Sequence, residues 1–198
     1  MRRVAILLFH DVEVLDACGP FEVFATTCDS AGGDLFQVFT VAATRKAIRA
    51  VGGLVMVPDY DFGSAPAAEI VLVPGGNGRK IAMHDTATLE WVRHANHASE
   101  MTLSVCTGAF ILASAGVLPP GPSSTHHSTF AEFDKTFPRH HAVPARYTQT
   151  GKVITAAGIS AGIDMSLHVV ELLHGAETAQ RTARRMEWEQ RGTAGKDR

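Results

Sequence analysis

One cysteine lies where a short apolar run gives way to a helical pattern. The stretch TLSVCTGAFILASAG, residues 102–116, predicts a buried strand, a turn at Cys106 and a helix from Thr107 to Ala115. Gly108 would allow a sharp strand-to-helix turn, as in a nucleophile elbow. Backbone N–H groups and the positive end of a helix dipole favour the thiolate form of such a cysteine. The motif predicts a nucleophilic Cys106; the alternative is a cysteine that merely ends a strand.

Two other stretches carry groups that could assist a thiolate. In VPGGNG, Gly75 and Gly76 follow an apolar run, and glycine lets backbone N–H groups approach a developing anion. We expect the N–H groups of Gly76 and Thr107 to act as oxyanion donors, although a plain turn is the alternative. In LDACGPFEVF, Asp16 is either a helix cap or a carboxyl group directed at the thiol.

Histidines are the remaining candidates for acid–base chemistry. In SSTHHSTF, His126 precedes a helical pattern, and histidine is the usual base or orienting group for a cysteine nucleophile. The other histidines lack the spacing of metal ligands, so we expect no metal ion. Asp164 suits the first turn of a helix, and a catalytic role for it is disfavoured.

Alternating strands and helices must position these residues. Apolar runs predict strands, and helical patterns lie between them, which favours an α/β fold with a doubly wound, mostly parallel sheet between helices. Ligands bind such sheets beyond the carboxyl ends of the strands, where Asp16, Gly75, Gly76 and Cys106 should meet. The expected strands are 4–9, 36–43, 69–76, 102–106 and 152–158, and the expected helices are 16–30, 86–98, 107–115, 128–136, 160–173 and 176–189. Residues 45–67 should form a hairpin and loop insertion.

Length and charge limit the class of protein. The 198 residues fit one domain, which we place at 1–190 with a polar tail at 191–198. A net charge of −2 gives no surface for nucleic acid or an anionic membrane, and no apolar stretch approaches the ~20 residues of a membrane helix. Three cysteines without a CxxC pair fit a reducing cytoplasm, and a small molecule is the expected partner.

The ordered motifs resemble the PfpI superfamily, which includes the Parkinsonism-associated deglycase and the intracellular protease. The resemblance covers nearly the whole chain and implies a class I glutamine-amidotransferase-like, flavodoxin-like three-layer sandwich and a homodimer. It extends through DACGPFEVF, AEIVLVPGG, SVCTGAFILASAGVL, SSTHH and GKVITAAGISAGIDMSLHVVELLHG. Cys106 matches the family's elbow cysteine, Asp16 its acidic partner and His126 its loop histidine.

Within that superfamily, Thr107 after the cysteine and an aspartate as the acid resemble the isonitrile hydratase branch. This resemblance implies a cysteine-dependent hydro-lyase that converts an isonitrile into an N-substituted formamide through a thioimidate on Cys106. Asp16 would move the proton and Thr107 would orient water or the nitrogen. The reaction implied by this resemblance would need no cofactor. Two alternatives stay open: a sensor or redox module, as in AraC-type regulators, and a glyoxalase-like enzyme that depends on His126. Because this sequence has no room for a C-terminal helix-turn-helix module, we expect a stand-alone enzyme.

Overall fold

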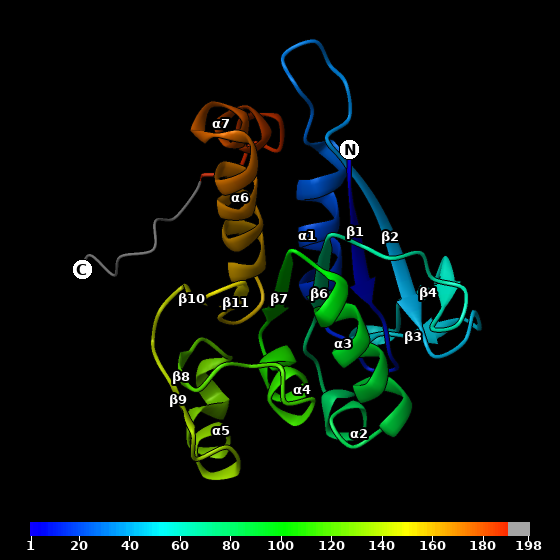
Figure 1. The fold of residues 1–198 in the computed structure, drawn as a ribbon, viewed down its shortest axis with the longest axis vertical. Coiled ribbons are helices and arrows are strands. Elements are labelled where there is room, and N and C mark those ends of the chain that lie inside the picture. The colour runs from blue at the N-terminus through cyan, green and yellow to red at the C-terminus, as the bar shows by residue number, and fades with distance from the viewer. Residues whose placement is uncertain (190–198) are drawn as a thin grey trace.

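A single seven-stranded sheet forms the centre of the molecule. The computed structural model describes residues 1–189, and the predicted tail at 191–198 lies outside them. Within these residues the strand order is β10-β11-β7-β6-β1-β2-β5 (Figure 1), and every pairing except β10–β11 is parallel. The bounds are β1 Arg2–Leu7, β2 Phe36–Ala42, β5 Tyr60–Asp61, β6 Ile70–Val73, β7 Met101–Val105, β10 Tyr147–Thr150 and β11 Val153–Ala156. The predicted doubly wound, mostly parallel α/β fold is confirmed.

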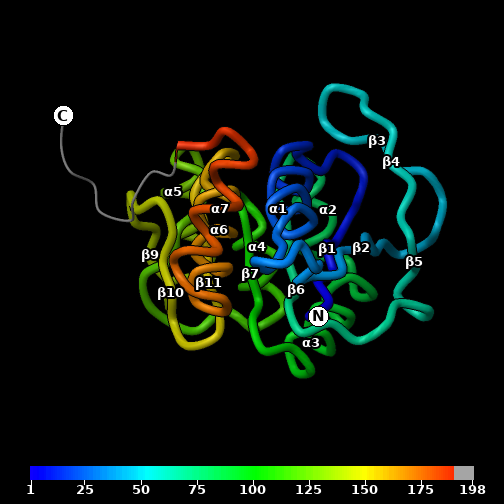
Figure 2. Tube along the Cα trace, turned by 90° about the horizontal axis from the view of Figure 1, so that it is seen from above, coloured from blue at the N-terminus to red at the C-terminus, as the bar shows by residue number. Residues whose placement is uncertain are grey.

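Helices cover both faces of this sheet. One core cluster joins the sheet to α1, α6 and α7, which lie side by side (Figure 2), and a second joins it to α2, α3, α4 and α5. Val4 and Ile6 of β1 belong to the first cluster and Leu7 to the second, because side chains alternate along a strand. The bounds are α1 Val14–Thr26, α2 Arg79–Ala82, α3 Thr86–Ala98, α4 Gly108–Ser114, α5 Phe130–Thr136, α6 Ala161–His174 and α7 Ala176–Arg185.

The expected helices agree with these bounds to within a few residues. The largest differences are at the ends: α1 begins at Val14 and ends at Thr26, and α7 ends at Arg185. The Thr27 hydroxyl donates to the Val23 carbonyl at 2.6 Å, so the end of α1 is bonded by a side chain instead of continuing to Ser30. Within residues 1–189, no helix is both long and apolar enough to cross a membrane.

Two small ribbons lie outside the main sheet. The predicted hairpin in residues 45–67 is present as β3 Ile48–Arg49 paired antiparallel with β4 Val55–Met56, with a 3-10 turn at Val51–Gly53 between them. It projects beside β5 at one edge of the molecule (Figure 2). A second ribbon pairs β8 Gly121–Ser123 with β9 His140–Ala142, and a 3-10 turn at His127–Thr129 precedes α5. The sequence did not predict β8, β9, β10 or the short helix α2.

The parallel strands β1, β6, β7 and β11 all end at one edge of the sheet. The loops after β1 and β6 are joined there by a bridge between Val12 and Gly76, and the Glu13 N–H donates to the Gly75 carbonyl at 2.9 Å. The loop after β11 reaches the same place, where the Cys106 N–H donates to the Ala157 carbonyl at 3.1 Å. The expected convergence of loops at the carboxyl edge is therefore confirmed.

Candidate active site

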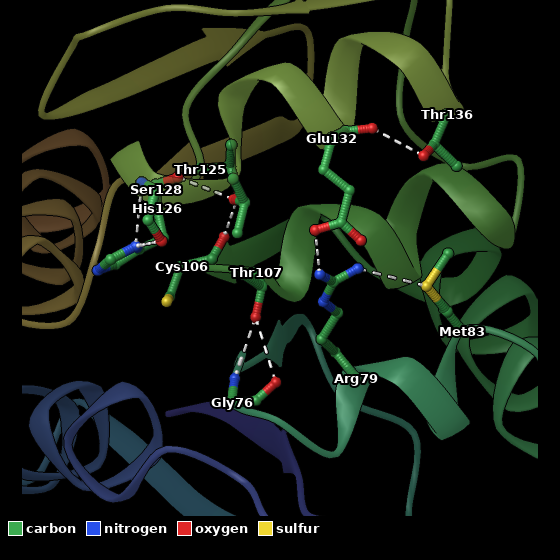
Figure 3. Close-up of polar contacts among 11 residues, drawn as sticks. Gly76, Arg79, Met83, Cys106, Thr107, Thr125, His126, Ser128, Glu132 and Thr136 are labelled. Carbon is green, nitrogen blue, oxygen red and sulfur yellow. Dashed lines mark hydrogen bonds and ion pairs between the residues drawn. The ribbon is translucent and has the colours of Figure 1, made fainter.

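Cys106 occupies a strained turn between β7 and α4. Its φ angle of 57° lies in the left-handed region, which residues other than glycine rarely adopt. A Cβ atom on Gly108 would lie 2.1 Å from the Val73 carbonyl oxygen, so only glycine fits two residues after the cysteine. The Thr125 hydroxyl donates to the Cys106 carbonyl at 3.0 Å and helps to hold the turn (Figure 3). The predicted sharp strand-to-helix turn is confirmed.

Asp16 lies in the first turn of α1 and is completely buried. Its Oδ2 atom accepts a hydrogen bond from the Gly75 N–H at 2.9 Å, whereas its buried Oδ1 atom has no hydrogen-bond partner among the described residues. The carboxyl group and the Cys106 thiol lie close enough to interact electrostatically, and each affects the pKa of the other. Glu13, rather than Asp16, holds the N-cap position of α1. Of the two alternatives for Asp16, the structure therefore favours the carboxyl group beside the thiol.

Burial dominates the protonation of both groups. The pKa of Asp16 is raised to about 7, mainly by desolvation and partly by the charge of Glu13, although the Gly75 hydrogen bond lowers it. The pKa of Cys106 is raised to about 12, mainly by desolvation and partly by the adjacent Asp16. At neutral pH the two side chains therefore hold between one and two protons.

The expectation that a helix dipole makes Cys106 a thiolate is wrong for the resting protein. The backbone N–H groups of Thr107 and Ile159 do lower the pKa of the sulfur, but burial outweighs them. Helix α4 has only seven residues, and Cys106 is 6% exposed. The thiol must instead lose its proton to a neighbour, and Asp16 is placed to receive it.

The glycines expected as oxyanion donors make bonds within the site. The Gly75 N–H is donated to Asp16, and the Gly76 N–H is donated to the Thr107 hydroxyl at 3.1 Å (Figure 3). A Cβ atom on Gly75 would lie 2.5 Å from the Thr107 nitrogen. In this structure the Gly75 N–H thus binds Asp16 instead of pointing into the cavity as a free oxyanion donor. The Gly76 N–H likewise holds the Thr107 side chain in place.

His126 lies at the side of the site. Its Nδ1 atom is 2.7 Å from the Ser128 hydroxyl, and its ring lies against that of His127 with centroids 4.3 Å apart. Burial lowers the pKa of His126, so its ring is neutral at pH 7. A Cβ atom on Gly158 would lie 2.3 Å from its Cδ2 atom, which shows how closely the loop after β11 packs on the ring.

A cavity of about 330 Å³ joins these groups. Cys106, Thr107 and His126 line it, together with residues that the sequence analysis did not select: Glu13, Asn77, Arg79, Lys80, Glu132 and Ile159. The clearest signal for Arg79 was its position directly after PGGNG at the carboxyl edge; Glu132 had no comparable signal. Within the described part of the chain, no cluster of three or more histidine, cysteine, aspartate or glutamate side chains could hold a metal ion.

Known proteins share both the sequence and the fold. An isonitrile hydratase of Pseudomonas putida is 31% identical over 188 residues, which cover 94% of this chain and 78% of that protein. The HTH-type transcriptional regulator GbdR of Pseudomonas aeruginosa is 26% identical over 178 residues, 89% of this chain and 48% of the regulator. The chain thus spans about half the length of that regulator.

Solved structures and a family model agree with these relatives. The structure of a ThiJ/PfpI family protein from Pseudomonas syringae superposes with a TM-score of 0.85 at 26% identity, covering 98% of this chain and 78% of that one. Drosophila melanogaster DJ-1beta superposes with a TM-score of 0.81 at 16% identity, covering 95% and 98%. The family model described as DJ-1/PfpI matches residues 2–172. The chain therefore belongs to the DJ-1/PfpI family.

Proposed function

We propose that the protein hydrates isonitriles to N-substituted formamides, with Cys106 as nucleophile and Asp16 as the group that moves the proton. The observation that carries this proposal is the burial of Asp16 next to Cys106, whose side chain lines a cavity. The identity of 31% to an isonitrile hydratase supports the same reaction. The likeness to regulators shows that the family also includes proteins of other function.

The reaction starts from the state in which the pair holds one proton. The sulfur attacks the terminal isonitrile carbon, and that carbon receives the proton held between Asp16 and Cys106. The product is a thioimidate, R–N=CH–S–Cys106, and Asp16 is left as a carboxylate. A water molecule then adds to the same carbon, and Asp16 accepts one of its protons and passes it to the nitrogen, which gives R–NH–CH(OH)–S–Cys106. When this intermediate collapses, its hydroxyl proton returns to the Asp16–Cys106 pair. Collapse releases R–NH–CHO and restores the shared proton, so atoms and charges balance.

Thr107 and His126 are the side chains placed to direct this sequence. The Thr107 hydroxyl lies at the cavity and is fixed by Gly76, so it can orient the attacking water or the substrate nitrogen. His126 is neutral and bonded through Nδ1 to Ser128, which leaves its Nε2 edge for the substrate. Both assignments are part of the proposal.

Direct product analysis tests the function. Wild-type protein is incubated with cyclohexyl isocyanide and N-cyclohexylformamide is measured, with Cys106→Ala as the matched inactive variant. Brief reaction followed by acid quenching and mass spectrometry should also find the thioimidate on Cys106. No formamide from several isonitriles would overturn the proposal, and equal turnover by Cys106→Ala would overturn the mechanism.

The pH dependence of turnover should report the Asp16–Cys106 pair. Asp16 has a pKa of about 7, so below this pH the pair carries two protons and the thiol has no base. We expect kcat/KM to fall about tenfold per pH unit below about 7 and to be flat from pH 8 to 10. Steady-state rates from pH 5 to 10 give the profile; a constant rate down to pH 5 would contradict it.

Gly158 offers a way to move His126 without deleting it. A methyl group there would lie 2.3 Å from the imidazole Cδ2 atom and would push the end of a side chain rather than the backbone. We expect Gly158→Ala to lower kcat/KM by about tenfold through misplacement of the ring. The double variant Gly158→Ala/His126→Ala should be no slower than His126→Ala alone; a further loss would show that Gly158 acts elsewhere.

A sensor function is the second candidate, favoured by the likeness to the regulator GbdR. A peroxide sensor needs a thiolate, whereas burial raises the pKa of Cys106 to about 12. Sulfinic acid on Cys106 after mild peroxide, without any turnover, would favour the sensor over the hydratase. The raised pKa therefore places this candidate second.

We also propose a cytoplasmic homodimer. Leu54, Val55 and Val57, in and beside the β3–β4 hairpin, are 49%, 52% and 68% exposed and form an apolar surface that a second copy could cover. Light scattering should give twice the chain mass of 21.2 kDa. A monomer at micromolar concentration would contradict this part of the proposal.

A further inference from the structure

The wall of the cavity contains a half-buried ion pair that the proposed mechanism does not use. The Arg79 side chain is only 5% exposed, and its Nη2 atom lies 2.5 Å from Glu132 Oε2. The guanidinium group lies 4.0 Å from the centre of the Phe110 ring, and its Nη1 atom donates to the Met83 sulfur at 3.7 Å (Figure 3). Arg79 is therefore held on three sides and is a rigid anchor for Glu132.

Glu132 is the accessible half of this pair. Its side chain is 51% exposed and lines the cavity that contains Cys106. The Arg79 hydrogen bond lowers the pKa of Glu132, so the group is ionised at neutral pH. A carboxylate has about four acceptor positions on its two oxygens, and the ion pair is made by Oε2. The cavity thus contains a fixed anionic acceptor on the side of α5.

The other lining groups favour a polar occupant. Val51 and Ile159 are the only two aliphatic side chains among the described lining residues, and a hydrocarbon tail would meet mostly polar groups. Glu13 supplies a second carboxylate, and Lys80 supplies an exposed ammonium group. Because Arg79 is buried against Glu132, its charge is not open to an anionic substrate. The arrangement favours a hydrogen-bond donor over an anion and over an alkyl group.

We propose that Glu132, held in place by Arg79, selects isonitriles whose end remote from the reacting carbon carries a hydroxyl or ammonium group. This inference rests on the proposed hydratase function. The donor group would bond to the Glu132 carboxylate while the isonitrile carbon faces Cys106. Arg79 acts through Glu132 and is a positioning residue.

Isosteric substrate pairs test the inference. 3-Hydroxypropyl isocyanide and butyl isocyanide differ by a hydroxyl in place of a methyl group, and 4-hydroxybutyl and pentyl isocyanides extend the pair by one carbon. We expect the wild-type kcat/KM to favour the hydroxyl member of at least one pair by about tenfold or more, as a hydrogen bond to a charged group allows. The anionic 3-isocyanopropanoate, carrying a carboxylate, should be slower than either neutral substrate of similar length.

Two variants assign the preference to Glu132. Glu132→Leu removes the acceptor but leaves the buried Arg79 unbalanced, which can impair folding. The double variant Arg79→Met/Glu132→Leu removes both charges next to Met83 and Phe110 and avoids that problem. In the double variant we expect the hydroxyl preference to disappear, so that the two members of each substrate pair have equal kcat/KM. Glu177→Gln, which breaks the exposed Arg181–Glu177 pair on α7, is the matched control and should keep the wild-type preference.

A binding measurement separates this inference from the hydratase proposal. The formamides N-(3-hydroxypropyl)formamide and N-butylformamide are used to protect Cys106 from alkylation by iodoacetamide. Stronger protection by the hydroxyl compound, lost in the double variant, supports selection by Glu132 even if no isonitrile is hydrated. Three results would overturn the inference. The first is hydration without any preference for the hydroxyl substrate, and the second is a preference that survives in the double variant. The third is equal or absent protection by the two formamides in a protein that shows no turnover. Faster reaction of 3-isocyanopropanoate, lost in Lys80→Met, would show that the cavity selects anions instead.

Discussion

Asp16→Asn is expected to lower kcat/KM for isonitrile hydration by about 10²–10⁴-fold. Asparagine has nearly the same shape and can still accept the Gly75 N–H hydrogen bond, so the geometry of the loop should persist. It cannot accept the Cys106 proton or return it to the isonitrile carbon. Because burial raises the pKa of the thiol to about 12, the variant would hold a protonated, unreactive sulfur at neutral pH.

The same substitution should stabilise the folded protein at alkaline pH. The folded pKa of Asp16, about 7, lies above the model value of 3.8, so the folded state binds more protons between these two values. Stability from this group is complete below about pH 4 and is lost as pH rises through 7. The shift corresponds to roughly 4 kcal/mol, taken as an upper order of magnitude. Asp16→Asn should therefore raise Tm at pH 8 and change it little at pH 4.

Glu22→Gln is the matched control for both measurements. Glu22 lies on the same helix as Asp16 but is exposed. Glu22→Gln should therefore leave kcat/KM within about twofold of wild type and Tm within about one degree. The combination of lost turnover and higher Tm at pH 8 is expected only for a buried catalytic acid whose pKa is raised by desolvation. Wild-type rates in Asp16→Asn would exclude Asp16 as the proton carrier, and a lower Tm at pH 8 would exclude the raised pKa.

Local patterns were enough to predict the turn and the meeting of loops. Gly108 two residues after Cys106 identifies the sharp turn because any side chain there would strike the Val73 carbonyl. The long apolar runs predicted parallel strands, and parallel strands place their following loops at one edge. Asp16 and Cys106, ninety positions apart in the sequence, could be paired from that rule and from the family resemblance.

The electrostatic state of the site could not be read from local patterns. The dipole of α4 is a property of one helix, whereas the pKa of the Cys106 sulfur depends mainly on burial, to which loops distant in the sequence contribute. The partner of the Gly75 N–H likewise depends on where α1 places Asp16. The Arg79–Glu132 pair could not be predicted either, because its two residues lie 53 positions apart and neither belongs to a recognisable motif. Contacts of this kind exist only in the folded chain.

Gly75→Ala is expected to lower turnover by about 10²-fold or more, although it adds only one methyl group. Its Cβ atom would lie 2.5 Å from the Thr107 nitrogen, 2.6 Å from the Thr107 hydroxyl oxygen and 3.0 Å from Asp16 Oδ2. The nearest of these atoms is backbone, so the loop after β6 must move away from the start of α4. That movement separates the Gly75 N–H from Asp16 and the Gly76 N–H from Thr107, and so disturbs both side chains that the mechanism places beside Cys106.

Gly63→Ala provides the comparison, because a Cβ atom at Gly63 meets only the Asp61 side chain, at an ordinary 3.5 Å. It should keep wild-type activity, which shows that a glycine-to-alanine change is harmless where there is space. Circular dichroism and Tm would show that Gly75→Ala still folds, and the pH profile would show whether its acid limb has moved from about 7. Turnover within threefold of wild type would mean that the Gly75–Asp16 contact does not set the rate. A large loss with an unchanged fold would instead mean that the position of the Asp16 carboxyl, more than its presence, controls proton transfer to the isonitrile carbon.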